Sequence, residues 1–260
     1  MKIHPLTPKL KALRLSGMLD SLEERAEQAR LGHLGPVEFF ALLLDDELAR
    51  REQGAQARRL RLAHFEQLKT LAQFDFAAVP ALDQRLVLEM ATCHFIAEKR
   101  NWLLHGPTGV GKSHLASSIG YEAITRGYSV RQATCHVLMA DLFAARADAS
   151  YGKKLKEVVT CDLLILDDFG LRPLSPTGGE DLYEIIRQRY ERGSLILTSN
   201  RAPSEWADLF GDALLTSAAL DRLTHHARLT AITGDSYRQR QRRAERPDAP
   251  ASGGETPGGY

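Results

Sequence analysis

Two different hydrophobic patterns run along the chain. Towards the amino terminus, apolar residues recur every three or four positions, which is the spacing of one face of an α-helix. The first such face consists of Leu15, Leu19, Leu22, Ala26 and Ala29. Gly32 and Gly35 end this helix, and Pro36 begins a second one. The apolar stripe of the second helix consists of Phe40, Leu43, Leu44 and Leu48. A third helical stretch rich in arginine follows, so we expect residues 1–74 to form an all-helical domain.

Beyond a proline-containing linker at residues 75–83, short apolar runs alternate with longer amphipathic segments. The apolar runs are Trp102–His105, Ser129–Ala133, Leu163–Leu166, Leu195–Thr198 and Arg228–Ile232. Strands that alternate with helices are typical of βαβ units, whose helices cover a parallel sheet. We therefore predict an α/β domain at residues 75–240, with a five-stranded parallel sheet between helices. Residues 241–260 are rich in arginine and then in proline and glycine, a composition typical of a disordered tail.

Composition changes this picture little. The 260 residues are 43% apolar and carry a net charge of only +1, so no overall field favours nucleic acid as a partner. The three cysteines, Cys93, Cys135 and Cys161, lie far apart, and we expect reduced, packed thiols in a cytoplasmic protein. The amino terminus has lysine, arginine and proline where a signal peptide needs an apolar core, and no apolar run approaches the roughly 18 residues of a membrane span. We therefore expect no membrane association.

The stretch GPTGVGKS lies between a predicted strand and a predicted helix and fits the phosphate-loop pattern G-x-x-x-x-G-K-[ST]. Its residues are Gly106, Pro107, Thr108, Gly109, Val110, Gly111, Lys112 and Ser113. With so little side chain, consecutive backbone N–H groups can turn inward and bind phosphate oxygens beside the positive end of the next helix. Lys112 would reach the β- and γ-phosphates and Ser113 would bind magnesium. The loop therefore predicts a site for a nucleoside triphosphate.

Two further strands end in polar residues that such a site needs. The run CDLLILDD ends in Asp167, which would support the magnesium ion, and Asp168, which would orient or deprotonate water. An apolar run that ends in two aspartates is also a common strand terminus, but its place about fifty residues after the phosphate loop favours the catalytic interpretation. Asn200 ends the run ILTSN and could bridge the γ-phosphate and the water, although asparagine is also a common turn residue.

The adjacent pair His225 and His226 could suggest a metal site. Neighbouring residues on a helix diverge by about 100°, so they cannot easily share one ion. We therefore expect this pair to serve packing or the charge at a helix end.

The spacing of GPTGVGKS, LLILDD and LTSN resembles the AAA+ ATPases, in the branch of replication initiators and helicase loaders. The chain is more similar to the IstB-type transposition helper ATPases, over all but roughly its last twenty residues. Segments at both ends carry this resemblance, including LRLSGMLDSLEERAEQA, FFALLLDDELARRE, ALLTSAALDRLTHHA and TGDSYR. The resemblance implies an ATPase that uses ATP and Mg²⁺ and self-associates into an ATP-dependent oligomer.

The resemblance also implies roles for two arginines. Arg222, in LDRL, matches the arginine finger that reaches the γ-phosphate bound by a neighbouring subunit, and Arg238, in DSYR, matches a second arginine near the nucleotide. A guanidinium there would offset charge in the transition state. Only 28 residues follow Ile232, so we expect no carboxyl-terminal lid domain. Asp168 stands where many of these ATPases have glutamate, and the shorter acid predicts slow hydrolysis.

Basic clusters provide candidate DNA contacts. The segment YGKKLKE carries Lys153, Lys154 and Lys156, and the predicted third helical stretch carries Arg58, Arg59 and Arg61. Such runs are usually solvated surfaces, yet binding to the DNA backbone needs only lysine and arginine along a path. The initiator branch carries DNA-contacting elements where YGKKLKE lies, which favours the lysines.

The favoured function is therefore a DNA-stimulated ATPase that assembles on duplex DNA and assists the transposase of an insertion sequence. A replicative helicase loader, with the same ATPase and a helicase as its client, is the alternative. A small-molecule kinase is disfavoured, because it leaves Arg222 and the helical domain without a purpose. The sequence LRLSGMLDSLEERAEQA favours the transposition helper over the loader.

Overall fold

The computed structural model describes residues 5–206, 210, 213–234, 236 and 237. The chain divides into two compact units, Met1–Leu62 and Ala63–Tyr260. Residues 63–74, which the hydrophobic pattern assigns to the helical domain, group with the second unit. Among the described residues, no helix combines the length and the apolar character that a membrane crossing requires.

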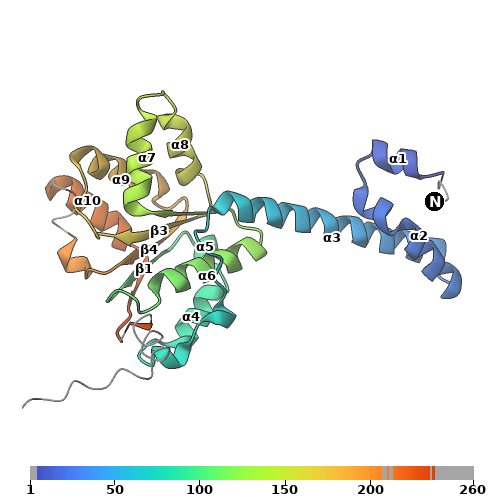
Figure 1. Ribbon diagram of the computed structural model, residues 1–260, viewed down its shortest axis with the longest axis horizontal. Coiled ribbons are helices and arrows are strands. Elements are labelled where there is room, and N and C mark those ends of the chain that lie inside the picture. The colour runs from blue at the N-terminus through green and yellow to red at the C-terminus, as the bar shows by residue number, and fades with distance from the viewer. Residues whose placement is uncertain (1–4, 207–209, 211–212, 235, 238–260) are drawn as a thin grey trace, which may run out of the picture. The chain divides into compact units, whose positions relative to one another are not determined.

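The first unit is helical (Figure 1). Its helices are α1 (Thr7–Ala12), α2 (Ser16–Leu31) and α3 (Pro36–Ala63). Their shared core contains the buried side chains of Met18, Leu22 and Leu43, with Leu15 and Phe39 packed against it. The prediction of a separate third helix is wrong, because α3 continues unbroken through the arginine-rich stretch.

Helices α2 and α3 approach closely at Gly17. A Cβ atom there would lie 2.7 Å from the carbonyl oxygen of Asp46, so no larger residue fits. The buried Glu47 carboxylate accepts a hydrogen bond of 2.7 Å from the N–H of Gly17 and thereby caps the start of α2. Arg25 donates from Nε and Nη2 to the two carboxylate oxygens of Asp46, at 2.8 Å each. This hydrogen-bonded ion pair lowers the pKa of Asp46 to about 2.

The packing of α2 on α3 contradicts the predicted apolar stripe of α3. Of its four members only Leu43 is buried, while Phe40, Leu44 and Leu48 are 55%, 40% and 64% exposed. The face that meets α2 carries Phe39, Leu43 and Glu47, which shares only Leu43 with the predicted stripe and is rotated from it by roughly 80° around the helix axis. Spacing alone could not show which of two overlapping stripes would find a partner.

The second unit is an α/β fold around a parallel sheet, as predicted (Figure 1). Its strands are β1 (Asn101–His105), β2 (Val130–Thr134), β3 (Leu163–Phe169), β4 (Ser194–Ser199) and β5 (Ala227–Ala231). They lie in the order β2-β3-β4-β1-β5. Its α-helices are α4 (Gln84–Ala91), α5 (His94–Ala97), α6 (Lys112–Thr125), α7 (Cys135–Ala145), α8 (Tyr151–Val159), α9 (Pro176–Arg189) and α10 (Ala213–Thr224). Its 3-10 helices are η1 (Leu71–Gln73), η2 (Phe76–Ala78) and η3 (Pro203–Glu205).

Helices cover both faces of the sheet, with α6 on one face and α7 to α10 on the other (Figure 1). Side chains alternate accordingly: Leu164 and Leu166 of β3 face the α7–α10 layer, whereas Ile165 lies beside Gly120 of α6. This two-sided burial explains why β3 and β4 appear in the sequence as continuous apolar runs.

Residues 64–74 pack against β2 and α6 of the second unit. The Glu66 carboxylate accepts a hydrogen bond of 2.9 Å from the Thr134 hydroxyl, and the Thr70 carbonyl accepts one of 3.1 Å from Nε2 of His114. The Phe74 ring meets the His114 ring edge to face. These contacts explain why this segment groups with the α/β unit.

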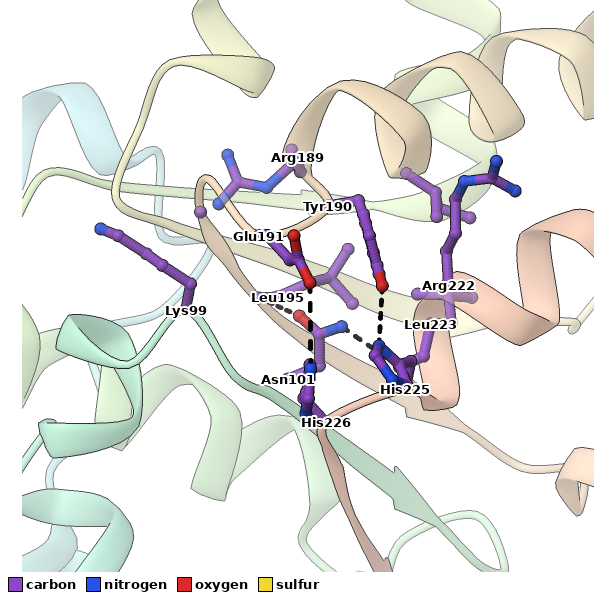
Figure 2. A pocket seen from close by; sticks show the side chains of 12 residues that line it. Lys99, Asn101, Arg189, Tyr190, Glu191, Leu195, Arg222, Leu223, His225 and His226 are labelled. Carbon is purple, nitrogen blue, oxygen red and sulfur yellow. Dashed lines mark hydrogen bonds and ion pairs between the residues drawn. The ribbon is translucent and has the colours of Figure 1, made fainter.

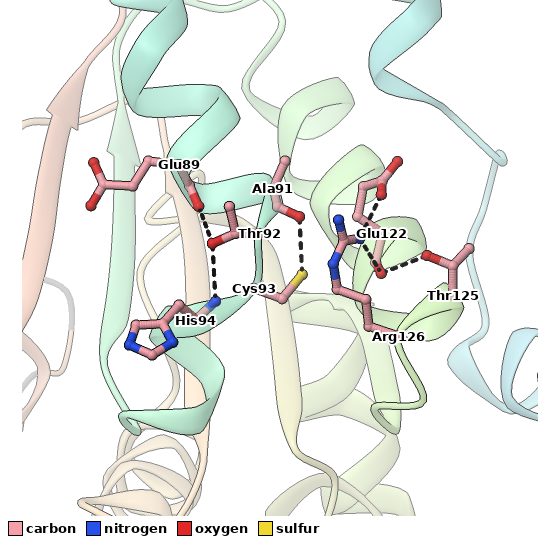
Figure 3. A network of polar contacts seen from close by, with 8 residues as sticks. All are labelled: Glu89, Ala91, Thr92, Cys93, His94, Glu122, Thr125 and Arg126. Carbon is pink, nitrogen blue, oxygen red and sulfur yellow. Dashed lines mark hydrogen bonds and ion pairs between the residues drawn. The ribbon is translucent and has the colours of Figure 1, made fainter.

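A buried arginine joins the layers at one further place. The Arg189 guanidinium is almost fully buried and donates to the carbonyl oxygens of Val158, Cys161 and Ser194 at 2.8, 2.8 and 2.5 Å, so it ties the end of α8 to β3 and β4. Cys93 joins α4 to α5 in a left-handed conformation and donates its thiol to the Ala91 carbonyl (Figure 3).

All three cysteines are free, as the sequence predicts. Cys93 and Cys135 are buried, and burial raises their thiol pKa values to about 11 and about 12. Cys161 is partly buried and its pKa is raised for the same reason. Thiols held in the protonated form are poor nucleophiles and poor metal ligands.

Candidate functional site

The phosphate loop begins where β1 ends and leads into α6. Gly106 has φ 146°, and a Cβ atom there would lie 2.0 Å from the carbonyl oxygen of Ile232. Gly111, with φ 99°, lies just before α6. Val110 is buried and anchors the loop, whereas Pro107 and Thr108 are exposed. The loop therefore presents backbone rather than side chains at the start of a helix.

Lys112 lies at the start of α6 and is 6% exposed. Its Nζ atom donates to the carbonyl oxygens of Gly106 and Pro107 at 2.8 Å each, so the ammonium group bridges the loop from within. Burial lowers the pKa of Lys112, and the nearby carboxylates of Asp168 and Asp167 oppose that shift. A phosphate group in the loop would offer this cation a stronger, charged acceptor than two carbonyls.

Next to the loop, one hydrogen-bonded cluster joins α6, β3 and β4. The Asp167 carboxylate accepts a hydrogen bond of 2.8 Å from the Ser113 hydroxyl. The same Asp167 oxygen accepts a second hydrogen bond from the Thr198 hydroxyl, and that hydroxyl accepts one of 3.0 Å from the N–H of Asp168. Thr198 is fully buried, and Asp167 is 8% exposed. One threonine therefore orients both acids.

Asp168 differs from Asp167 in its backbone conformation and in its exposure to solvent. Its backbone has φ 54°, a left-handed conformation that turns its side chain away from the alternation of β3, and the side chain is exposed. Partial loss of water contact raises the pKa of Asp168, and the adjacent Asp167 carboxylate raises it further. An exposed carboxylate with a raised pKa beside a metal-ligand candidate has the character of a general base.

Strand order brings the predicted site residues together. Because β4 lies between β1 and β3, the phosphate loop, Asn200 and the two aspartates all follow the carboxyl ends of neighbouring parallel strands. The loop is also joined to β4 directly, since the N–H of Gly106 donates to the carbonyl oxygen of Ser199 at 3.1 Å. Asn200 itself is exposed just beyond β4. A ligand at this edge would touch three strand ends at once.

Sequence reasoning missed two residues of this region. Thr198 lies in the ILTSN run, directly after three apolar residues of β4. A polar side chain at this buried position is the signal that could have identified it. Phe74 lies against the loop, because a Cβ atom on Gly111 would be 2.8 Å from its ring. Nothing in the local pattern around Phe74 indicates this contact.

Arg222 does not lie in this cluster. It stands near the end of α10 beside a small cavity of about 20 Å³, which is also lined by Asn101 and Leu195, residues at the amino ends of β1 and β4 (Figure 2). Asn101 donates to the carbonyl oxygen of Leu223 at 3.1 Å and so holds this end of α10 at the amino end of β1. The phosphate loop follows the other end of β1, about 13 Å further along the strand.

Arg238 lies outside the described residues. The residue before it, Tyr237, donates its N–H to the carbonyl oxygen of Gly109 at 3.0 Å. A Cβ atom on Gly109 would lie 2.3 Å from the Ser236 hydroxyl oxygen. The described end of the TGDSYR segment therefore contacts the phosphate loop.

The candidate DNA-binding residues belong to different units. Lys153 and Lys156 are exposed on α8, whose opposite face buries Leu155 and Val158, and Lys154 is partly buried. On α3, Arg58 and Arg61 are exposed, whereas Arg59 forms an ion pair of 2.5 Å with Glu52. The two groups lie in separate units, so only α8 belongs to the unit that carries the phosphate loop.

The role of Thr198 leads to a prediction. Thr198→Val keeps the side-chain shape but deprives Asp167 of a donor and the Asp168 N–H of its acceptor, so we expect a loss of about 1–3 kcal/mol in the free energy of unfolding. We also expect Mg²⁺-dependent ATP binding to weaken by about 10- to 100-fold, as for other residues that orient a metal ligand. Titrating a fluorescent ATP analogue with and without Mg²⁺ measures this. Thr198→Ser, which keeps the hydroxyl, is the matched control, and an equal loss in both variants would contradict the orienting role.

Comparisons with known proteins agree with this geometry. The family model of the IstB-like ATP binding protein matches residues 8–245. The chain is 42% identical over 234 residues to an ATP-binding protein in an insertion sequence of Mycobacterium tuberculosis, covering 90% of this chain and 93% of the relative. It is 38% identical over 233 residues to the ATP-binding protein of insertion sequence IS5376 from Geobacillus stearothermophilus, with the same coverage of both chains, 90% and 93%.

Solved structures show the same fold at low identity. The crystal structure of DnaI superposes with a TM-score of 0.56 at 22% identity, covering 66% of this chain and 93% of that one. AMPPCP-bound DnaA from Aquifex aeolicus also gives a TM-score of 0.56 at 22% identity, over 72% of this chain and 56% of that one. The α/β unit thus has the fold of the AAA+ proteins. The chain belongs to the family of IstB-like ATP-binding proteins of insertion sequences.

Proposed function

We propose that this protein hydrolyses ATP, assembles on duplex DNA in the cytoplasm and assists the transposase of its insertion sequence. The observation that carries the ATPase part is the cluster of Ser113, Asp167, Thr198 and Asp168 beside the phosphate loop. Membership in a family named for insertion sequences supports the transposase as the client.

The residues of the site fit ATP and magnesium. Gly106, Gly109 and Gly111 all have positive φ, a backbone conformation suited to a loop that turns N–H groups towards phosphate oxygens. A serine hydroxyl next to a carboxylate is the oxygen-only donor set that Mg²⁺ prefers. When bound, the metal would neutralise charge that develops on the phosphates.

Each residue then has a task in hydrolysis. Lys112 exchanges its two carbonyl acceptors for phosphate oxygens. Ser113 and Asp167 hold the metal, and Asp168 takes the proton of the attacking water. Asn200, at the adjacent strand end, orients that water relative to the γ-phosphate.

The arginine finger acts between subunits in this proposal. Arg222 stands near the amino end of β1, whereas the phosphate loop of the same chain follows the opposite end of that strand. A finger at this place serves the ATP of a neighbouring copy, which makes hydrolysis depend on assembly. We infer that ATP and DNA together gather the subunits.

The decisive experiment measures ATP turnover with and without duplex DNA. We expect duplex DNA to raise turnover, and Lys112→Ala protein, which should lose ATP binding, to show neither basal nor stimulated activity. Turnover that is indifferent to DNA would contradict the proposal. A replicative helicase loader is the alternative, but the likeness to DnaI lies at 22% identity, shows the fold alone and carries no function. Stimulation of a replicative helicase in place of the transposase would favour that alternative.

The lysines of α8 provide a separate test of DNA contact. Contacts between lysine and phosphate release counterions, so replacing Lys153, Lys154 and Lys156 together with Gln should reduce the slope of log affinity against log salt by up to about three. Fluorescence anisotropy with a labelled duplex at several salt concentrations measures the slope. A control with the same charge change replaces Lys9, Lys11 and Lys69. An unchanged slope in the α8 variant would exclude DNA contact by the α8 lysines and would favour the arginines of α3 or of the tail as the contacts.

A further inference from the structure

We propose that Glu191, His225 and His226 form a binding site for one divalent transition-metal ion, separate from the ATP site. One ligand atom from each of these three residues lies within 4.8 Å of the other two. They come from two turns: Glu191 lies between α9 and β4, and the histidines lie between α10 and β5. Figure 2 shows the three side chains converging beside the small cavity near Arg222.

The backbone of the second turn makes the histidine pair possible. We expected neighbouring residues on a helix to diverge, but α10 ends at Thr224, and neither histidine is helical. His226 adopts a left-handed conformation with φ 59°. As a result the two imidazole rings lie on the same side, with centroids 3.8 Å apart and planes at 47°. The premise that both histidines belong to a helix is therefore wrong.

Glu191 supplies the third ligand from across the cavity. It too has a left-handed backbone, with φ 57°, and its carboxylate oxygen lies 3.9 Å from Nε2 of His226. This separation is longer than a direct hydrogen bond and close to the distance between two ligands of one metal ion, since each bonds at about 2.0–2.2 Å. The side chains of Glu191 and His226 are 61% and 53% exposed, so an ion can enter without any opening of the fold.

Tyr190 holds the remaining ring in place. Its hydroxyl lies 2.7 Å from Nδ1 of His225, and the two rings are stacked with centroids 5.9 Å apart. In the tautomer in which Nδ1–H of His225 donates this bond to the Tyr190 oxygen, Nε2 carries a free lone pair and is available as a ligand. Metal-binding histidines characteristically use one nitrogen for the ion and the other for such an orienting hydrogen bond.

The donor set indicates the class of ion. Two imidazoles and one carboxylate suit Zn²⁺, Ni²⁺, Co²⁺ or Cu²⁺, whereas Mg²⁺ and Ca²⁺ favour oxygen ligands alone. Three protein ligands leave a position for water. The ion would tie the end of α10 to the turn that begins after α9, so its binding should also raise thermal stability.

The test titrates the full chain, free of nucleotide and of Mg²⁺, with Ni²⁺ in a calorimeter and follows thermal unfolding in parallel. We expect one ion per chain and a higher unfolding midpoint. The double variant His225→Ala, His226→Ala should lose both effects. Tyr190→Phe, which keeps the stacked ring, should weaken binding by about tenfold or more.

His94→Ala is the matched control, because His94 is also an exposed histidine beside a carboxylate, with Glu98 at 3.3 Å. Among the described residues, His94 belongs to no group of three such ligands. This variant should bind Ni²⁺ like the wild type. Circular dichroism and ATP binding check that the double variant is folded. Wild-type stoichiometry and affinity in the folded double variant would overturn the proposal, and so would a wild-type chain that binds no Ni²⁺.

Discussion

Arg222→Ala protein is expected to bind ATP as the wild type does and to hydrolyse it about 10³- to 10⁵-fold more slowly, the usual contribution of an arginine finger. Its phosphate loop is intact, and Arg222 lies beside the amino ends of β1 and β4, away from that loop. Within its own chain the side chain donates to the Ala218 carbonyl at 2.7 Å and lies over the Tyr183 ring. Binding of a fluorescent ATP analogue and phosphate release under saturating ATP separate the two effects. Arg228→Ala, an exposed arginine of β5, is the charge-matched control.

Mixing variants tests whether the finger acts between subunits. Lys112→Ala protein should be inactive because its loop lacks the phosphate-binding cation, yet it still carries Arg222. In a mixture with Arg222→Ala protein, the intact loop of one copy can meet the intact finger of the other. Part of the ATPase activity should return, most strongly with duplex DNA present. An inactive mixture, with association verified by light scattering, would argue against a finger in trans, and full activity of Arg222→Ala alone would remove this arginine from the mechanism.

Asp168→Asn protein is expected to retain Mg²⁺-ATP and to hydrolyse it about 10²- to 10⁴-fold more slowly, which is the usual loss for a missing general base. The substitution leaves the hydrogen bonds of Ser113 and Thr198 to Asp167 in place, so the residues proposed to bind the metal remain oriented. Single-turnover phosphate release, measured beside ATP affinity, checks this expectation. Asp168→Glu keeps the base and should remain active, and undiminished turnover of the asparagine variant would place the base elsewhere.

The pH dependence of hydrolysis offers a second measure of Asp168. The pKa of this carboxyl is raised from its ordinary value of 3.8, first by partial loss of water contact and then by the Asp167 carboxylate. A general base works only when ionised, so turnover should fall as the pH drops through this raised pKa, at a higher pH than for an ordinary aspartate. The acid limb should disappear from the residual activity of Asp168→Asn. If the limb persists in that variant, it belongs to another group.

Much of the fold follows from local pattern alone. The apolar runs identify all five strands to within a residue or two at most ends. The signal is strongest for β3 and β4, because a strand that is buried on both faces is largely apolar. The phosphate loop and the paired acids are similarly visible, since their chemistry depends on residues that are adjacent in the chain. GPTGVGKS could be assigned to phosphate binding before any fold was known.

The features that the sequence pattern could not predict depend on residues that come into contact only after folding. Phe40 and Leu43 share one predicted stripe, but α2 covers only Leu43, because the choice of face depends on packing between two helices. Thr198 acquires its importance from the position of β4 between β1 and β3, an order that no local spacing encodes. Likewise, the left-handed turn at His226 replaces the helical geometry that was expected for the histidine pair and brings the two rings together. Backbone conformation in a turn and strand order in a sheet are set by contacts between distant segments, so tertiary structure alone decided them.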